Sequence, residues 1–374
     1  MKPKLLCKLP RYAVILFFVF LLGCAVKLLS ALSAPFAAAY TRTVGAALRA
    51  LLGAVSSILP ISIAETAILL ILPMTVYFTV RLIGARRRLR YFCRIAIALC
   101  SLCFYLFGSF FLLYGAGYHT PPLKERLYPE ATEISDDDLL ETTVYLMVQA
   151  NAAAKRVTYG QDGASISPYS LRGTAKKLTA AYNAAAKDHD FIQPLFATAK
   201  PIALSAPLSY TQMAGFYTFY TGEVNINVNY PDYIVAFTTA HEMAHQRGVA
   251  REDEADFTAF LACVGSDDPY LVYCGYVNML KSALTAMARN GDGRLADLMS
   301  YLSDDVRGEF ASYARRFARY DGHFAGKVAD ALDGAYLRAQ GVFDGTKSYG
   351  RAIELAVAYY QDGRTNRTLP DIIH

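Results

Sequence analysis

Three long apolar runs near the N-terminus constrain this chain more than any other feature of its sequence. They cover Tyr12–Leu32, Ile61–Ile83 and Ile95–Tyr114, and the third contains no charged residue. Each run has about 20 residues, the length at which an α-helix crosses a hydrocarbon core roughly 30 Å thick. The sequence therefore predicts three transmembrane helices and a multi-pass protein of the cell membrane, with the lipid bilayer as a partner.

Basic residues near the ends of these runs predict their orientation. The first segment, MKPKLLCKLPR, and the loop containing ARRRLR are rich in Lys and Arg, whereas only Arg42 and Arg49 separate the first two runs. Positively charged loops stay preferentially in the cytoplasm. We therefore expect a cytoplasmic N-terminus and an extracytoplasmic chain after Tyr114. A cleaved signal peptide or acylation at Cys24 is the alternative for the first run, and neither changes that side.

The distribution of charge divides the chain into two unlike parts. Residues 1–116 contain 13 Lys and Arg and one acid, Glu65, which leaves 24 basic and 31 acidic residues for positions 117–374. We expect a membrane domain over 1–116 and an extracytoplasmic domain over 117–374. Folded domains that bind nucleic acid are usually basic, and this one is acidic, so we expect no nucleic-acid partner.

The residues after the third run predict a mostly helical domain with one pair of strands. SDDDLLETTVYLMVQANAAAKRV starts at Ser135 with an acidic first turn, which is typical of a helix start. PLSYTQMAGFYTFYTGEVNINVNYPD is rich in aromatic and β-branched residues and predicts a strand, a turn at Thr-Gly and a second strand, EVNINV. A helix, YIVAFTTAHEMAHQRG, is expected to follow.

That last helix carries the motif H-E-x-x-H at His241, Glu242 and His245. Residues four apart project from one helix face, so both imidazoles can reach one Zn²⁺ ion, with Glu242 at the edge of that face. A zinc held by two histidines and one carboxylate keeps a position for water. Glu242 is placed to act on that water as a general base in peptide hydrolysis. The alternative is an amphipathic helix with two surface histidines.

The residues alone leave the third zinc ligand open. A third histidine in H-E-x-x-H-x-x-G-x-x-H would fall at position 251, which is Arg251, so the three-histidine class is excluded. Gly248 is expected to end the helix. Four carboxylates that follow closely are candidates: Glu252, Asp253, Glu254 and Asp256.

EDEADFTA contains E-x-x-A-D-x-x-A, which resembles the glutamate-ligand helix of gluzincin-type membrane proteases. The resemblance implies that Glu252 binds zinc and that Asp256, four residues on, orients a histidine. In those proteases the glutamate usually lies far beyond the second histidine, whereas Glu252 lies seven residues beyond His245. Glu254 therefore remains a rival.

A wider resemblance covers nearly the whole chain. GFYTFYTGEVNIN leading into HEMAHQRGVAREDEADFTAFLAC, behind three apolar runs, is similar to a family of bacterial membrane proteins known as domain-of-unknown-function 3810. The resemblance is most specific over residues 215–263. It implies a zinc-peptidase-like domain. The fold expected from the whole sequence is mainly α: three N-terminal transmembrane helices precede a mostly helical, zincin-like α+β domain with a short edge-strand hairpin. The resemblance supports His241, Glu242, His245 and an acidic residue of REDE as the site.

We expect a membrane-anchored zinc metallopeptidase that cleaves peptides or proteins of the cell envelope. As an edge strand, the second strand would bind the substrate backbone. Its residues are Glu223, Val224, Asn225, Ile226 and Asn227. A zinc-binding sensor that keeps the fold without cleaving is the alternative, and the intact Glu242 argues against it.

Two further expectations concern single residues of the large domain. Tyr276 is a candidate hydrogen-bond donor to the oxyanion of the reaction. Cys263 and Cys274 could form a disulfide if the domain lies outside the cell.

Overall fold

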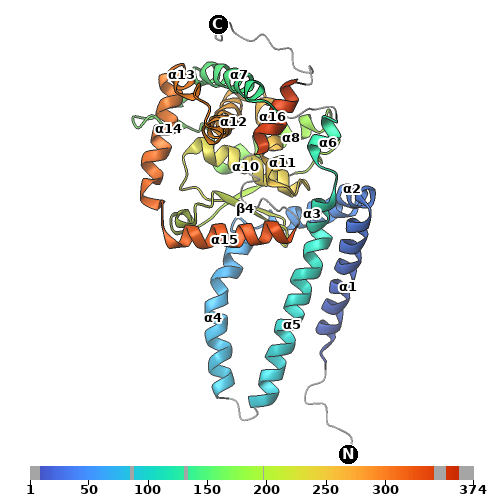
Figure 1. The fold of residues 1–374 in the computed structure, drawn as a ribbon. Coiled ribbons are helices and arrows are strands. Elements are labelled where there is room, and N and C mark those ends of the chain that lie inside the picture. The colour runs from blue at the N-terminus through green and yellow to red at the C-terminus, as the bar shows by residue number, and fades with distance from the viewer. Residues whose placement is uncertain (1–8, 85–87, 130–133, 197, 341–350, 362–374) are drawn as a thin grey trace, which may run out of the picture. The chain divides into compact units, whose positions relative to one another are not determined.

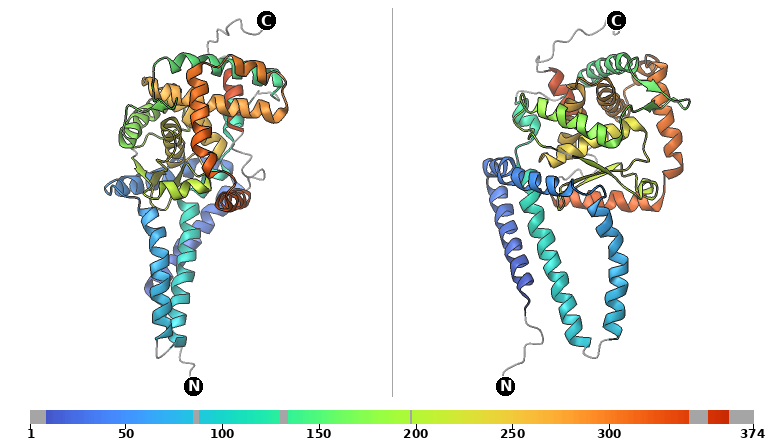
Figure 2. Two further views of the ribbon diagram at one scale, coloured as in Figure 1. Left: turned by 90° about the vertical axis from the view of Figure 1, so that its left-hand side faces the viewer. Right: turned by 180° about the vertical axis from the view of Figure 1, so that it is seen from behind.

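The computed structural model describes residues 9–84, 88–129, 134–196, 198–340 and 351–361. The described chain is mainly helical, with two small sheets, and it divides into two compact units. Unit 1 comprises Met1–Thr120 and Thr218–Glu223, and unit 2 comprises Pro121–Tyr217 and Val224–His374. Figures 1 and 2 show the elements of each unit.

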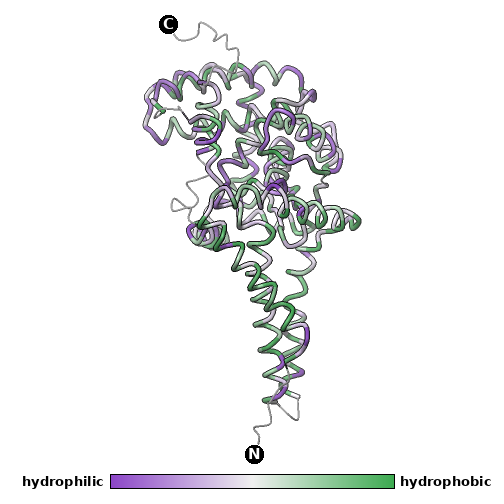
Figure 3. Tube along the Cα trace, turned by 90° about the vertical axis from the view of Figure 1, so that its right-hand side faces the viewer, coloured by the Kyte–Doolittle hydropathy of each residue, from purple (hydrophilic) through white to green (hydrophobic). Residues whose placement is uncertain are grey.

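Unit 1 contains the long apolar helices. Three are long and apolar enough to cross a membrane: α1 (Arg11–Leu32), α4 (Ile63–Ile83) and most of α5 (Arg88–Leu113). Their hydrophobic character dominates the lower part of Figure 3. The three predicted runs are therefore helices suited to membrane anchoring. Several basic residues used to predict orientation lie outside the described residues, and the orientation stays a prediction: Lys2, Lys4, Lys8, Arg86 and Arg87.

Close packing and backbone capping hold unit 1 together. Gly23 of α1 meets Gly108 of α5, and a Cβ at either position would overlap the backbone of the other helix. The segment after α1 folds as α2 (Ala34–Arg42) and α3 (Val44–Ser56), and η1 (Gly115–His119) follows α5. The buried guanidinium of Arg49 donates to the Thr41 carbonyl (2.9 Å) and the Leu113 carbonyl (3.3 Å). It thereby satisfies acceptors at the ends of α2 and α5, which have no partner inside their helices.

Glu223 gives unit 1 a further cap. Its carboxylate accepts hydrogen bonds from the backbone N–H groups of Ile63 (2.9 Å) and Ala64 (3.0 Å), in the first turn of α4. A carboxylate at this position satisfies orphan donors and interacts favourably with the helix dipole. Glu223 therefore stabilises the start of a candidate membrane helix.

Unit 2 arranges its helices around one hydrophobic core. The predicted start at Ser135 is confirmed, because Ser135 and Asp138 form a capping box. Helix α10 packs against α8, α11 and α12, and α11 packs against α16. The helices of this unit are α6 (Leu123–Leu127), α7 (Asp136–Ala154), α8 (Leu171–Ala185), α9 (Ser205–Leu208), η2 (Ser209–Thr211), α10 (Asp232–Gln246), α11 (Glu252–Val264), α12 (Pro269–Asn290), α13 (Leu295–Ser300), α14 (Asp304–Phe317), η3 (Ala318–Tyr320), α15 (Phe324–Ala339) and α16 (Ala352–Gln361).

The sheets are small. Strands β1 (Thr158–Tyr159) and β2 (Ser165–Ile166) form an antiparallel pair. The second sheet has the order β3-β5-β4, with β3 (Ala199–Pro201) parallel to β5 (Glu223–Ile226) and β4 (Gly215–Thr218) on the other side. The predicted strand–turn–strand is thus present as β4 and β5.

The prediction that Glu223–Asn227 forms an edge strand is wrong. β3, which the sequence did not reveal as a strand, pairs with one side of β5, and β4 pairs with the other. Residues Glu223–Asn227 are buried, and the backbone of β5 already has partners on both sides. Among the described residues, β3 and β4 each have a hydrogen-bonded strand on one side only, so these two strands are the edges of the sheet.

Candidate metal centre

Helix α10 carries the H-E-x-x-H motif in its buried C-terminal half. His241, Glu242 and His245 are 9%, 5% and 4% exposed. The helix ends at Gln246, and Gly248 follows with φ 100°. That left-handed region suits glycine, and it turns the chain toward α11. The predicted end of the helix at Gly248 is confirmed. The alternative of two surface histidines is wrong, because both side chains are buried.

Neighbouring side chains fix the end of α10 in place. The buried guanidinium of Arg247 donates to the carbonyls of Met243 (3.0 Å) and Leu195 (2.8 Å) and lies 4.3 Å from the ring centroid of Tyr182. The Tyr182 hydroxyl donates to the Ala240 carbonyl (2.6 Å). This polar framework holds the turn of helix that carries both histidines.

Three potential ligand atoms converge at this turn. His241 Nε2 and His245 Nε2 are 3.0 Å apart. Glu252 Oε2, from the first turn of α11, lies 3.1 Å from His241 Nε2 and 3.2 Å from His245 Nε2. Ligand atoms around a tetrahedral zinc, at about 2.0–2.1 Å from the ion, are roughly 3.3 Å apart. The observed separations are close to that value, and these three residues form a group with metal-ligand spacing.

The hydrogen bond made by Nδ1 of each imidazole determines whether its Nε2 atom carries a proton. His245 Nδ1 lies 2.7 Å from the Val249 carbonyl oxygen, which can only accept, so Nδ1 carries a proton. His241 Nδ1 lies 2.7 Å from Asp256 Oδ1 and likewise donates. In neutral imidazoles both Nε2 atoms are therefore lone-pair acceptors, and they face a carboxylate oxygen. Three acceptors in contact require a shared cation or proton, and this donor set suits zinc.

The charge balance of the group follows from this crowding. Burial would lower the pKa of His241, but the carboxylates of Asp256 and Glu252 raise it well above its ordinary value. Burial would raise the pKa of Glu252, but His245 and His241 hold it well below its usual range. The site therefore favours an anionic carboxylate beside positive charge, whether that charge is protons or a metal ion.

Glu242 lies beside this group and contacts β4. A Cβ added to Gly215 would come within 3.2 Å of Glu242 Cγ, and the backbone N–H of Tyr217 donates to the Glu242 carboxylate. Burial raises the pKa of Glu242, and His241 and His245 offset this only in part. The residue expected to be the base is therefore held between the candidate ligands and β4, an edge strand.

The structure separates the two glutamates that the sequence left as rivals. Glu252 reaches the histidines. Glu254 Oε1 instead accepts from the Leu123 backbone N–H (2.8 Å) and from Arg251 Nη1 (3.1 Å). Glu254 thus joins α11 to α6, and Glu252 is the carboxylate available to the group.

Other predicted residues have partners outside the three-residue group. Tyr276 of α12 hydrogen-bonds with Tyr145 and Tyr360 and packs edge-on against Phe260. Its hydroxyl thus has partners in a tyrosine cluster instead of at the candidate base. Residues Glu223–Ile226 form the buried central strand β5, and Asn227, which is also buried, follows it.

Cys263 and Cys274 are free, buried thiols and form no disulfide. Burial raises the pKa of the Cys263 thiol to about 12, so it behaves as a small apolar side chain.

Sequence reasoning missed three contributors to the site. Val249 orients His245 through a backbone carbonyl, which no side-chain pattern indicates. Tyr217 also acts through its backbone. Gly215 carried a usable signal, because a glycine inside a strand often marks a close approach of another group.

The chain matches a protein family, and the match extends well beyond the motif. The family is described as "Protein of unknown function (DUF3810)", and the match covers residues 40–357. Neither a curated protein nor a solved structure matches the chain.

Proposed function

This chain belongs to the DUF3810 family, and we propose that it is a membrane-anchored, zinc-dependent metallopeptidase with a zincin-like domain. One observation carries the proposal: the Nε2 atoms of His241 and His245 and one oxygen of Glu252 converge within 3.2 Å as acceptors. Asp256 and the Val249 carbonyl hold both rings in the tautomer that a metal needs. Two histidines and one glutamate match the ligand set of catalytic zinc sites in metallopeptidases.

The residues around the group have the roles that peptide hydrolysis needs. A zinc ion held by His241, His245 and Glu252 would supply Lewis-acid activation of a water molecule. Glu242 accepts the proton of the attacking water and returns it to the leaving amine. Asp256 is a positioning residue, because it acts on the reaction only through His241.

The edge strand β4 is the expected binding place of the substrate backbone. β4 lies against Glu242 through Gly215, and its outer side has no paired strand among the described residues. An extended peptide can add to such an edge through main-chain hydrogen bonds. We therefore assign substrate backbone binding to Gly215–Thr218 in place of Glu223–Asn227. The substrate class is a peptide or protein of the cell envelope, reached by an extracytoplasmic domain.

The test uses the full-length protein in lipid nanodiscs, with zinc content and hydrolysis of a peptide library as readouts. Glu242→Gln is expected to keep one equivalent of zinc and to lose about 10²–10⁴-fold in hydrolysis, the usual contribution of general-base catalysis. Glu125→Gln, an exposed glutamate on α6, is the matched control and is expected to behave as wild type. Hydrolysis by Glu242→Gln at the wild-type rate would contradict the proposal. Stoichiometric zinc without cleavage of any peptide would favour a non-cleaving zinc-binding sensor.

A further inference from the structure

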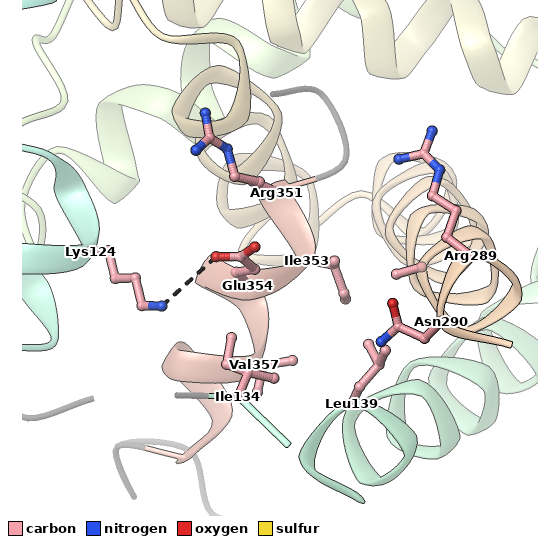
Figure 4. A pocket seen from close by; sticks show the side chains of 10 residues that line it. Lys124, Ile134, Leu139, Arg289, Asn290, Arg351, Ile353, Glu354 and Val357 are labelled. Atoms are coloured by element: carbon pink, nitrogen blue, oxygen red, sulfur yellow. Dashed lines mark ion pairs between the residues drawn. The ribbon is translucent and has the colours of Figure 1, made fainter. Parts of the chain in front are cut away.

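Unit 2 contains a cavity that shares no residue with the candidate metal centre. Its volume is about 410 Å³, within the range of small-molecule sites. Four helices and the segments beside them line it: α6, α7, α12 and α16 (Figure 4). The lining residues are Lys124, Ile134, Leu139, Ala286, Arg289, Asn290, Arg351, Ile353, Glu354 and Val357.

The charged residues of this cavity are mainly basic. Lys124, Arg289 and Arg351 line it together with a single acid, Glu354. Lys124 Nζ lies 3.8 Å from Glu354 Oε2, at the outer limit of an ion pair, and both side chains are partly exposed. Such a contact is weak, so it leaves Lys124 able to contact a second anion.

Arg289 is an exposed arginine on one side of this cavity. It stands in the last turn of α12, and the described part of the chain offers it neither a hydrogen bond nor an ion pair. Figure 4 shows its guanidinium on the opposite side of the cavity from Lys124. Arg351 lies immediately before α16. Burial raises the pKa of Asp253, and the positive charge of Arg351 offsets part of that rise. Lys124 and Arg351 thus each have a carboxylate nearby, and the described residues give no such partner to Arg289.

The rest of the lining is apolar. It consists of Ile134, Leu139, Ala286, Ile353 and Val357, from α7, α12, α16 and the segment before α7. A site that combines a few charged groups with an apolar wall fixes a ligand by its polar head and gains free energy from its apolar body. An inorganic anion would use only one half of such a site.

We propose that this cavity binds a small organic carboxylate with a short aliphatic body, the chemistry of an N-acylated aliphatic amino acid. The guanidinium of Arg289 holds the carboxylate, since a planar fork of donors matches its two oxygens. The aliphatic body lies against Leu139, Ile353 and Val357. This proposal does not depend on zinc or on peptide hydrolysis.

Calorimetric titration of the full-length protein in nanodiscs tests the proposal with matched probes. N-acetyl-leucine carries the carboxylate and the aliphatic body, N-acetyl-leucinamide lacks the charge, and acetate lacks the body. Loss of a charge-assisted hydrogen bond is expected to weaken binding about tenfold or more, so the amide should bind at least that much more weakly. Acetate and inorganic phosphate are each expected to bind more weakly than N-acetyl-leucine.

Variants locate the binding. Arg289→Gln is expected to weaken N-acetyl-leucine about tenfold, and Ala286→Phe to abolish binding by filling the apolar part. Arg307→Gln, an equal charge change on α14 outside the cavity, is expected to bind as wild type. Equal binding of acid and amide, tightest binding of phosphate, an unchanged Arg289→Gln, or no saturable binding up to about 10 mM would each overturn the proposal. A zinc-free sample that binds N-acetyl-leucine normally would leave this proposal standing even if the metallopeptidase proposal failed.

Discussion

Two carboxylates of unit 2, buried Glu309 and half-buried Glu252, lie in opposite surroundings. Glu309, on α14, accepts hydrogen bonds from the Ser165 backbone N–H (3.1 and 3.2 Å to its two oxygens) and from the Tyr273 hydroxyl (2.8 Å). Glu252, on α11, instead meets the Nε2 atoms of His241 and His245, which are acceptors in the neutral tautomers described above. The carboxylate of Glu309 has neutral donors, whereas the carboxylate of Glu252 needs a proton or a cation between it and the histidines.

The pKa shifts express the same difference. Burial raises the pKa of Glu309, and the hydrogen bonds of Ser165 and Tyr273 offset it only in part. The pKa of Glu252 is held well below its ordinary range by the two histidines, although burial opposes this. A buried carboxylate with neutral donors is a structural connection, here between β2, α12 and α14. The carboxylate of Glu252 instead depends on positive charge beside it, from protonated histidines or from a bound ion.

The largest expected effect comes from replacing Glu252 and Glu254 of α11 by alanine in separate variants. Glu252→Ala should lower zinc affinity by more than about 100-fold, because loss of a direct ligand exceeds the roughly 10–100-fold typical of outer partners. Glu254→Ala should keep the metal, since its carboxylate contacts Leu123 and Arg251. Competition of each full-length variant with a fluorescent zinc chelator measures both affinities. Equal zinc affinity in the two variants would remove the distinction between these glutamates.

A smaller effect is expected one step out from the ligands. Asp256→Asn should weaken zinc binding by about 10–100-fold, because the amide no longer fixes His241 through a charged acceptor. The same chelator competition measures it, and Asp253→Asn on the same helix turn is the control. Zinc affinity at the wild-type level in Asp256→Asn would show that His241 needs no orienting partner.

The smallest effect concerns Glu309, whose carboxylate accepts hydrogen bonds from Ser165 and Tyr273. Because the folded pKa of Glu309 is raised, its contribution to the free energy of unfolding is fully present below the unfolded pKa and is lost as the pH rises through the folded pKa. Glu309→Gln stays neutral, so between pH 4.5 and 8 its thermal midpoint should fall less than that of the wild type, while its zinc content stays normal. If the thermal midpoints of the wild type and Glu309→Gln changed in parallel with pH, the raised pKa of Glu309 would be contradicted.

The elements that follow local rules could be predicted from the sequence. The three apolar runs, the cap at Ser135 and the helix end at Gly248 each depend on a few adjacent residues, and all appear where expected. The convergence of His241, His245 and Glu252 was likewise accessible, because the motif and the resemblance together indicated it.

The parts that failed depend on contacts between distant segments. β3 contains Pro201 and only three residues, so nothing local marks it as the strand that covers β5. Glu223 lies about 160 positions from the helix start that it caps. Tyr276 looked no different from a donor at the site until its partners Tyr145 and Tyr360 were known. Strand order and buried hydrogen-bond partners are non-local properties, and periodicity does not encode them.

Zinc-edge X-ray absorption on the full-length protein, loaded with one equivalent of zinc, is the decisive test of the proposed zinc site. We expect a tightly held ion with only nitrogen and oxygen neighbours at about 2.0–2.1 Å, including the signature of two imidazoles, and loss of that spectrum in Glu252→Ala. Failure to retain zinc, or an unchanged spectrum in Glu252→Ala, would contradict it.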